Sequence, residues 1–147
     1  MTAVALVTVA LAAVAVWVRR RLLVVTVDGA SMEPALRGGD RVIVRRLRPG
    51  EAPARGRIVV ISEPGPCRPA DPSGRRGASL IVKRVSAVPG DPEPAYLPAW
   101  SRGPAGVVAA GHVVVLGDNA AVSRDSRRTG PVPARRVVGV VLRRISR

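Results

Sequence analysis

Residues 79–85 read Ser-Leu-Ile-Val-Lys-Arg-Val (SLIVKRV), and they contain the one lysine of the chain, Lys83. The run is short and rich in β-branched residues, which is typical of a β-strand. Side chains alternate between the two faces of a strand, so Ile81, Lys83 and Val85 share a face that is apolar apart from the amine. The sequence therefore predicts a strand that carries a lysine amine in apolar surroundings.

Similar runs recur along the chain, which has 27 Val and 5 Ile but no Phe in its 147 residues. Further strands are predicted at 22–27, 41–46, 57–62, 112–116 and 136–143. Residues 63–78 and 92–111 are rich in Pro, Gly and small residues and are predicted to be surface excursions. Residues 31–36 are predicted to form a helical turn. The expected fold class is mainly β.

The N-terminal segment differs from the rest because residues 2–18 are uncharged and almost wholly apolar. As a helix they would be about 25 Å long, within the range for one transmembrane helix. We predict an anchor with a basic flank over 1–21 and one β-rich domain over 22–147. A cleaved signal peptide with Ala13-Val14-Ala15 as its cleavage site is the alternative, but no positive n-region precedes the apolar run.

Composition excludes several classes of protein. One Cys and one His cannot form an internal disulfide or a structural zinc cluster, so no metal or cofactor is expected. Aromatic residues make up 2% of the chain, too few for stacking on bases, so no nucleic-acid partner is expected. The net charge of +14 suits contact with anionic membrane lipid. Cys67 has no assigned chemistry, and His112 is expected to pack against or cap a strand.

Two segments could supply a catalytic pair. Lys83 can lose its proton when buried, whereas the 23 arginines cannot. Ser31 lies in the segment DGASMEP (28–34), at a tight corner where backbone N–H groups can face a developing oxyanion. The alternatives are a surface lysine that happens not to be Arg and a serine that caps the following helical turn.

A third polar segment, GDNAAVSRDSR, covers residues 117–127 and follows a Val-rich run. Asp125 and Arg127 could pair and stiffen this loop, and a hydroxyl within it could orient a lysine amine. The alternative is a turn rich in Asp and Asn with a solvated run of charges.

These three segments, in this order, resemble the boxes of the type I signal peptidases, membrane-bound serine proteases that use a Ser–Lys dyad. Ser31-Met32-Glu33-Pro34 resembles the nucleophile box. Lys83-Arg84-Val85 with Val88-Pro89-Gly90-Asp91 resembles the general-base box, and 117–127 resembles the third box. The resemblance spans roughly residues 22–143. It implies an antiparallel β domain behind one N-terminal transmembrane helix.

The resemblance implies a role for each matching residue. Ser31 would attack the scissile carbonyl, Lys83 would act as the neutral base, and Ser123 would hold the lysine amine. Asp125 and Arg127 would form a supporting pair, and the third box adds Asp118 and Asn119 as supporting residues. The Ser31 backbone N–H would hold the oxyanion, because Gly29 stands where some members of the family carry a second hydroxyl donor.

The resemblance also implies the substrate, a preprotein whose signal peptide is cut after an Ala-X-Ala-like site. The expected walls of the small substrate pockets are Val27, Met32, Leu36 and Ile81. The substrate would lie extended against a strand edge near 79–83. The excursion at 92–111 is short, so the family's variable second subdomain is reduced to a loop or single hairpin.

Location and activity each leave an alternative open. Signal peptide cleavage implies a single-pass protein of the cell membrane with residues 22–147 outside, whereas Arg19–Arg21 favour the cytoplasmic side. A second interpretation, also a hydrolase, is that the chain is a self-cleaving Ser–Lys protein of the repressor type. A non-enzymatic basic module tethered to the membrane is a third, and it predicts that Lys83→Arg is silent.

Overall fold

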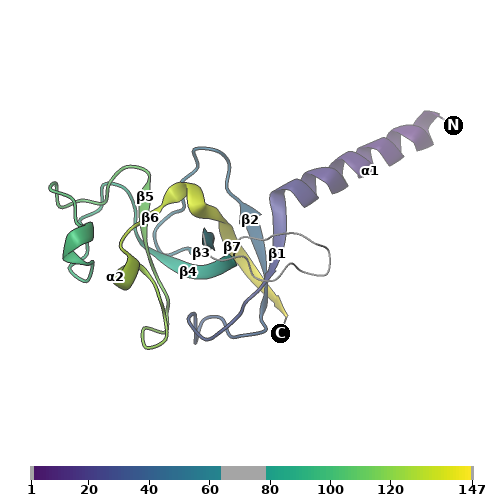
Figure 1. Cartoon of the computed structure of the whole chain (residues 1–147). Helices are drawn as coiled ribbons and strands as arrows, with labels where there is room; N and C mark the ends of the chain where they lie inside the picture. The colour runs from purple at the N-terminus through teal and green to yellow at the C-terminus, as the bar shows by residue number, and fades with distance from the viewer. Residues whose placement is uncertain (1, 64–78, 147) are drawn as a thin grey trace.

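Seven strands form one antiparallel sheet in the order β1-β2-β7-β3-β4-β5-β6 (Figure 1). This is a computed structural model that describes residues 2–63 and 79–146. The strands are β1 Leu22–Thr26, β2 Arg41–Arg46, β3 Ile58–Glu63, β4 Ser79–Ala87, β5 His112–Leu116, β6 Val132–Pro133 and β7 Val137–Ser146. The mainly β prediction is confirmed, and six strands lie within three residues of their expected ends.

The shorter elements were not predicted because they are too short to show a periodic pattern of apolar residues. They are the strand β6, the helix α2 (Ser126–Thr129) and two 3-10 turns, η1 (Ala99–Ser101) and η2 (Ala134–Arg136). The helical turn expected at 31–36 forms a series of turns, in which the Leu36 N–H donates to the Met32 carbonyl at 3.0 Å.

Strand β7 lies between β2 and β3, although it is the last strand in the chain. Val140 of β7 pairs with Arg45 of β2 on one side and with Val59 of β3 on the other. The sheet therefore consists of a β1–β2 pair and a β3–β6 part that β7 joins.

Strand β3 is buried on both faces, which explains its continuous apolar run. Val60 belongs to a core cluster with residues of β1, β2 and the segment after β1. Val59 and Ile61 belong to a second cluster with residues of β4, β5 and β7. Because neighbouring residues of a strand point to opposite faces, the two clusters lie on opposite sides of β3.

The excursion at 92–111 carries its own short pairing, an antiparallel bridge between Pro92 and Val107. Leu97 and Val108 are buried in a cluster with Ala87 of β4 and Val114 of β5, so the excursion packs against these two strands. Of the excursion expected at 63–78, residues 64–78 lie outside the described residues.

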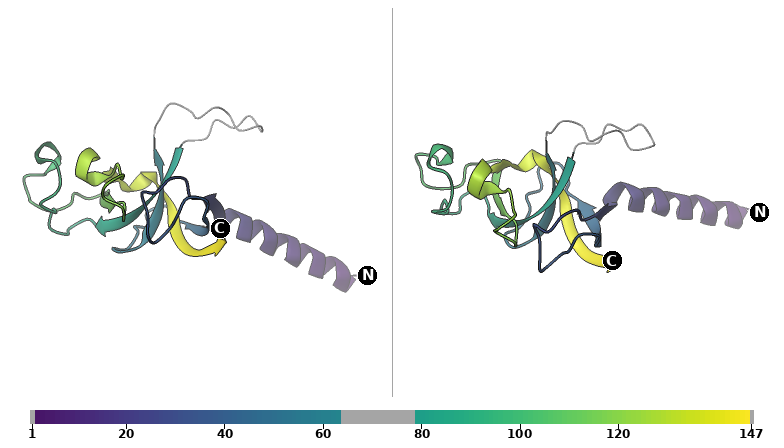
Figure 2. Two further views of the ribbon diagram at one scale, coloured as in Figure 1. Left: turned by 90° about the horizontal axis from the view of Figure 1, so that it is seen from below. Right: turned by 60° about the horizontal axis from the view of Figure 1, so that its bottom comes forward.

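Helix α1 (Thr2–Arg21) projects away from the sheet in all three views, and of the strands it contacts β1 and β2 (Figures 1 and 2). Its apolar side chains are exposed, Val9 by 67% and Leu11 by 65%. In the part of the chain that the structure describes, no helix combines the length and apolar character needed to cross a membrane. The expected transmembrane helix is therefore not confirmed, although the helix itself is present.

Candidate active site

Lys83 lies on β4 at the point where the pairing with β5 ends. The β4–β5 ladder begins with Arg84 opposite Leu116, and Lys83 is paired only with Val59 of β3. The neighbouring β5 strand therefore does not cover this part of β4. Ser31 and Ser123, from two separate loops, reach the amine here.

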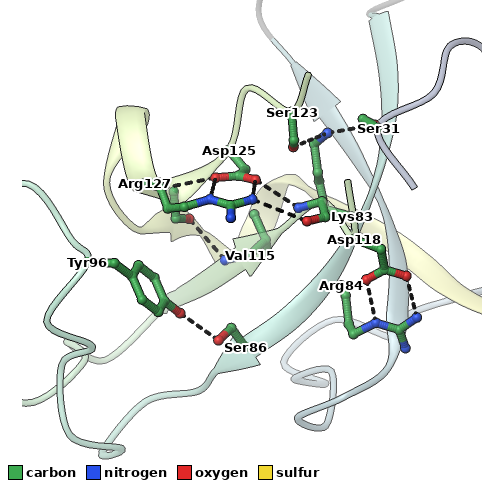
Figure 3. Close-up of polar contacts among 12 residues, drawn as sticks. Ser31, Lys83, Arg84, Ser86, Tyr96, Val115, Asp118, Ser123, Asp125 and Arg127 are labelled. Atoms are coloured by element: carbon green, nitrogen blue, oxygen red, sulfur yellow. Dashed lines mark hydrogen bonds and ion pairs between the residues drawn. The ribbon is translucent and has the colours of Figure 1, made fainter. Parts of the chain in front are cut away.

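The lysine amine lies between two hydroxyls (Figure 3). Lys83 Nζ is 2.9 Å from Ser31 Oγ and 3.1 Å from Ser123 Oγ. Lys83 and Ser123 are each 4% exposed, whereas Ser31 is half-buried. The amine is thus largely removed from water, whereas Ser31 is partly exposed.

Backbone hydrogen bonds hold the two serine loops together. The Asn119 N–H donates to the Ser31 carbonyl at 3.0 Å, and the Ser123 N–H donates to the Asn119 carbonyl at 3.1 Å. Asn119 therefore connects Ser31 to Ser123 through its main chain. The sequence had marked Asn119 as a supporting residue, and these bonds give it a physical role.

Gly117 is the residue at which these loops approach most closely. A Cβ at this position would lie 2.2 Å from Ser123 Oγ and 2.5 Å from the Ser31 carbonyl oxygen. Real Cβ atoms essentially never come within 3.0 Å of such atoms. A glycine is therefore required here by space.

Asp125 anchors the third loop. Its carboxylate accepts bonds from Arg127 Nε at 3.0 Å, from an Arg127 terminal nitrogen at 2.6 Å and from the Gly117 N–H at 2.8 Å (Figure 3). Burial acts to raise the pKa of Asp125, but hydrogen bonds from Arg127, Gly117 and Ser123 outweigh it and hold that pKa well below its usual range. The expected Asp125–Arg127 pair is present in the structure.

The pKa of Lys83 is lowered, mainly because burial disfavours the ammonium form. Asp125 and Glu63 oppose this shift through their negative charge, and Arg127 adds to it. Because Arg127 is bonded directly to Asp125, it offsets part of the attraction of that carboxylate for a lysine proton. The environment thus favours the neutral amine that a general base requires.

Arg84 and Asp118 form a second ion pair beside the dyad. Arg84 Nε donates to one carboxylate oxygen at 2.8 Å, and a terminal nitrogen donates to the other at 2.7 Å (Figure 3). Arg84 also donates to the Gly56 carbonyl at 3.0 Å. The pair ties β4 to the loop after β5, and it is why Asp118 belongs to the site. Sequence reasoning missed this role of Arg84, although its place next to Lys83, on the opposite face of the strand, was a usable signal.

A second residue that sequence reasoning missed is Ser126. It is fully buried, and its Oγ accepts the Val115 N–H at 2.9 Å. This bond attaches the start of α2 to β5, and so it helps to place Ser123 and Asp125, which precede it. The Ser-x-Asp-Ser pattern at 123–126 was the sequence feature that could have pointed to Ser126.

The four expected pocket residues are not gathered in one place. Val27, Met32 and Leu36 are 2%, 1% and 5% exposed and pack in the core cluster that contains Val60. Ile81 is half-buried and packs against the other cluster, on the same face of β4 as Lys83. Their role as pocket walls stays a prediction.

Two residues, His112 and Cys67, have no assigned chemistry. His112 begins β5, and its Nδ1 is 3.2 Å from the Ala110 carbonyl, as a residue that caps a strand would be. Cys67 lies outside the described residues. Within residues 2–63 and 79–146, no group of three or more His, Cys, Asp or Glu side chains could hold a metal ion.

Comparison with known proteins places this site in context. The chain matches the family described as signal peptidase, peptidase S26, over residues 1–92 and 93–145. It is 31% identical over 121 residues to mitochondrial inner membrane protease subunit 1 of Schizosaccharomyces pombe, covering 80% of this chain and 69% of that protein.

Two further relatives give similar figures. The subunit 1 protein of Mus musculus is 36% identical over 111 residues, which cover 75% of this chain and 61% of that protein. A mitochondrial ATP-independent inner membrane protease subunit 1b of Arabidopsis thaliana is 37% identical over 121 residues, which cover 80% of this chain and 66% of that protein. The chain thus matches between 61% and 69% of the length of these three relatives.

Proposed function

Because this chain belongs to the signal peptidase family, peptidase S26, we propose that it is a serine endopeptidase that removes signal peptides from preproteins. The cut would follow an Ala-X-Ala-like site. The observation that carries the proposal is the amine of the buried Lys83, which lies 2.9 Å from the hydroxyl of the half-buried Ser31. This is a nucleophile within hydrogen-bond reach of a base that can be neutral.

In the proposed acylation step, the Ser31 hydroxyl donates its hydrogen bond to neutral Lys83 Nζ. The Ser31 oxygen attacks the scissile carbonyl while the proton passes to Nζ, and the carbonyl oxygen becomes an oxyanion. The Ser31 backbone N–H is the proposed donor to that oxyanion. Collapse of the tetrahedral intermediate breaks the C–N bond, and the Lys83 ammonium protonates the departing amine. An acyl-enzyme on Ser31 and a neutral lysine remain.

In the proposed deacylation step, Lys83 takes a proton from a water molecule that attacks the ester carbonyl. The second tetrahedral intermediate expels the Ser31 oxygen, which recovers its proton from Lys83. The signal peptide leaves with a carboxyl terminus. Ser123 Oγ, 3.1 Å from Nζ, holds the amine in line through both steps.

The charge arrangement suits a base that is alternately neutral and protonated. Burial favours the neutral amine before attack, whereas the negative charge of Asp125 favours the ammonium that forms during it. Arg127 and the Gly117 N–H keep Asp125 ionised, so its charge is constant through the cycle. Asp125 is thus proposed as a positioning and electrostatic residue and not as a proton carrier.

The unpaired side of β4 supports an extended substrate. Residues before Arg84 pair with β3 but not with β5, which leaves a strand edge directly beside the dyad. A peptide that adds to this edge would present its scissile bond to Ser31. By their printed names the relatives act at the mitochondrial inner membrane, which supports a substrate in transit across a membrane.

Membrane attachment through α1 is part of the proposal. The helix is apolar, exposed and directed away from the sheet, and it ends in Arg19–Arg21 beside β1. Residues 22–147 would then lie on the side where processed preproteins emerge. A C-terminal reporter that proved cytoplasmic in intact cells would refute this placement and leave the catalytic proposal intact.

The test is cleavage of a preprotein with an Ala-X-Ala site in detergent micelles. Wild type is compared with Ser31→Ala, Lys83→Arg and Ser86→Ala. The last variant is the matched control, because the Ser86 hydroxyl bonds to Tyr96 and not to the dyad. Wild type and Ser86→Ala should give product cut after the second Ala, and the other two variants should give none.

Two outcomes contradict the proposal. Product from Lys83→Arg at near the wild-type rate would show that Lys83 is not the base, because Arg stays protonated at neutral pH. Product from none of the four folded proteins would refute the substrate class. Thermal unfolding of each variant establishes that it is folded.

A further inference from the structure

One end of the sheet concentrates positive charge. Leu22, which follows Arg19–Arg21, pairs with Arg45, and Arg46 pairs with Gly139 of β7. The Leu47 N–H donates to the Val138 carbonyl at 3.1 Å, which brings the segment containing Arg48 beside the one containing Arg135 and Arg136. We call this set, Arg19–Arg21, Arg46, Arg48, Arg135 and Arg136, the basic end. In Figure 1 it lies at the top, where α1 meets the sheet.

A cavity of about 680 Å³ opens at the basic end. Leu47, Pro49, Ala134 and Val137 give it an apolar lining, and the exposed residues Arg48 and Arg135 also line it. None of its lining residues belongs to the dyad or to its supporting loop. The volume is in the range of pockets that take small ligands or headgroups.

Among the described residues that line this cavity, Glu51 is the one carboxylate, and it is already engaged. Glu51 accepts two hydrogen bonds from Arg45, at 2.7 and 3.1 Å, and one from the Arg48 N–H at 2.9 Å. The Arg45 hydrogen bond, foremost among these contacts, lowers the pKa of Glu51 to about 2, so it stays ionised and bound to Arg45. Among residues 2–63 and 79–146, the Arg48 and Arg135 side chains form no ion pair. Two cationic groups over an apolar lining are therefore available to an anion.

We propose that this cavity binds the phosphate headgroup of an anionic phospholipid and docks the basic end on a membrane. The apolar lining suits the glycerol and upper acyl carbons, and the two guanidiniums suit the phosphate. The exposed apolar surface of α1 begins at the same end, which favours a lipid surface over a soluble phosphate. The inference does not depend on the peptidase activity proposed above.

The test measures binding of the full chain to vesicles by flotation. Phosphatidylcholine vesicles are compared with vesicles that contain phosphatidylglycerol. The variant Arg48→Gln/Arg135→Gln removes both cavity cations. The matched control Arg37→Gln/Arg41→Gln makes the same change in net charge with two exposed arginines at the opposite end of β1 and β2.

Binding to anionic vesicles should weaken about 30-fold in the cavity variant and change less than threefold in the control. Equal loss in both variants would overturn the proposal, because it would show an effect of net charge alone. Because α1 can attach the full chain to either kind of vesicle, the quantity that tests the cavity is the gain in binding from neutral to anionic vesicles. A gain that is the same in wild type and in the cavity variant would also overturn the proposal. Release from anionic vesicles by millimolar glycerol phosphate would show that the cavity takes soluble phosphate instead.

Peptide cleavage in detergent, measured on the same preparations, separates this inference from the proposed function. A cavity variant that cleaves like wild type but has lost vesicle binding supports both. A wild type that binds anionic vesicles in the predicted way but cleaves nothing supports the lipid site alone.

Discussion

Replacing Gly117 with alanine tests the geometric account of the site. The new Cβ would meet Ser123 Oγ at 2.2 Å and the Ser31 carbonyl oxygen at 2.5 Å, whereas ordinary contact begins at 3.4 Å. Each neighbour must therefore move by about 1 Å, and both belong to the two serines whose hydroxyls bond to Lys83 Nζ. Misplacement of that size costs roughly 100-fold in rate, and overpacking costs about 1–3 kcal/mol of stability. We expect kcat to fall about 100-fold while the fold is retained.

The assay is steady-state cleavage of the preprotein, with thermal unfolding measured in parallel. Gly103→Ala is the matched control, because its nearest neighbour would be Glu93 Oε1 at 3.6 Å, an ordinary contact. The control should keep its activity and its midpoint of unfolding. A Gly117→Ala enzyme with kcat within threefold of wild type and an unchanged midpoint would show that the loops have room to spare. The account given for Gly117 would then be wrong.

Three further predictions concern the charged groups. Burial lowers the pKa of Lys83, so kcat/KM should rise with pH along a limb whose midpoint lies below the ordinary 10.5, and a midpoint at or above that value would contradict a buried base. The pKa of Asp125 is held low in the folded state, so its stabilisation is present above the unfolded value of about 3.9 and is lost as pH falls towards the folded pKa. Urea unfolding should show Asp125→Asn to be about 1–3 kcal/mol less stable than wild type at pH 7. Below pH 4 the stability of the variant should fall less steeply with pH than that of wild type. Stability curves of the two proteins that run parallel below pH 4 would contradict the stabilising role of the Asp125 carboxylate. Arg84→Lys breaks the two-point contact with Asp118 and should cost about 1 kcal/mol in urea unfolding. A double-mutant cycle with Asp118→Asn that gives no coupling energy would contradict the pair.

Much of the sheet could be predicted because most of its strands have a recognisable local sequence pattern. Runs such as 41–46 and 112–116 are apolar, β-branched and bounded by turn residues, so their existence and ends follow from short-range pattern. The order of the strands could not be predicted, since the place of β7 between β2 and β3 is decided by long-range packing. β6 was missed because two residues, one of them Pro133, carry no strand signal.

The candidate site divides in the same way. Ser31 and Lys83 were found through residue type and context, and their 2.9 Å separation agrees with that choice. The contribution of Gly117 depends on how closely two loops approach, which no local pattern expresses. Val27 and Met32 were chosen for their nearness in sequence to Ser31, and their role as pocket walls stays a prediction. Both are buried in the core cluster beneath the loop that bears Ser31.

The central place of β7 has a consequence for the timing of biosynthesis. Ser31 lies in the connection between β1 and β2, and Lys83 belongs to the other half of the sheet. Strand β7, which is synthesised after both residues, joins the two halves. A growing chain therefore holds Ser31 and Lys83 on parts of the sheet that are not yet joined. The contact between Ser31 and Lys83 can therefore form only after synthesis has passed both residues and β7 has closed the sheet.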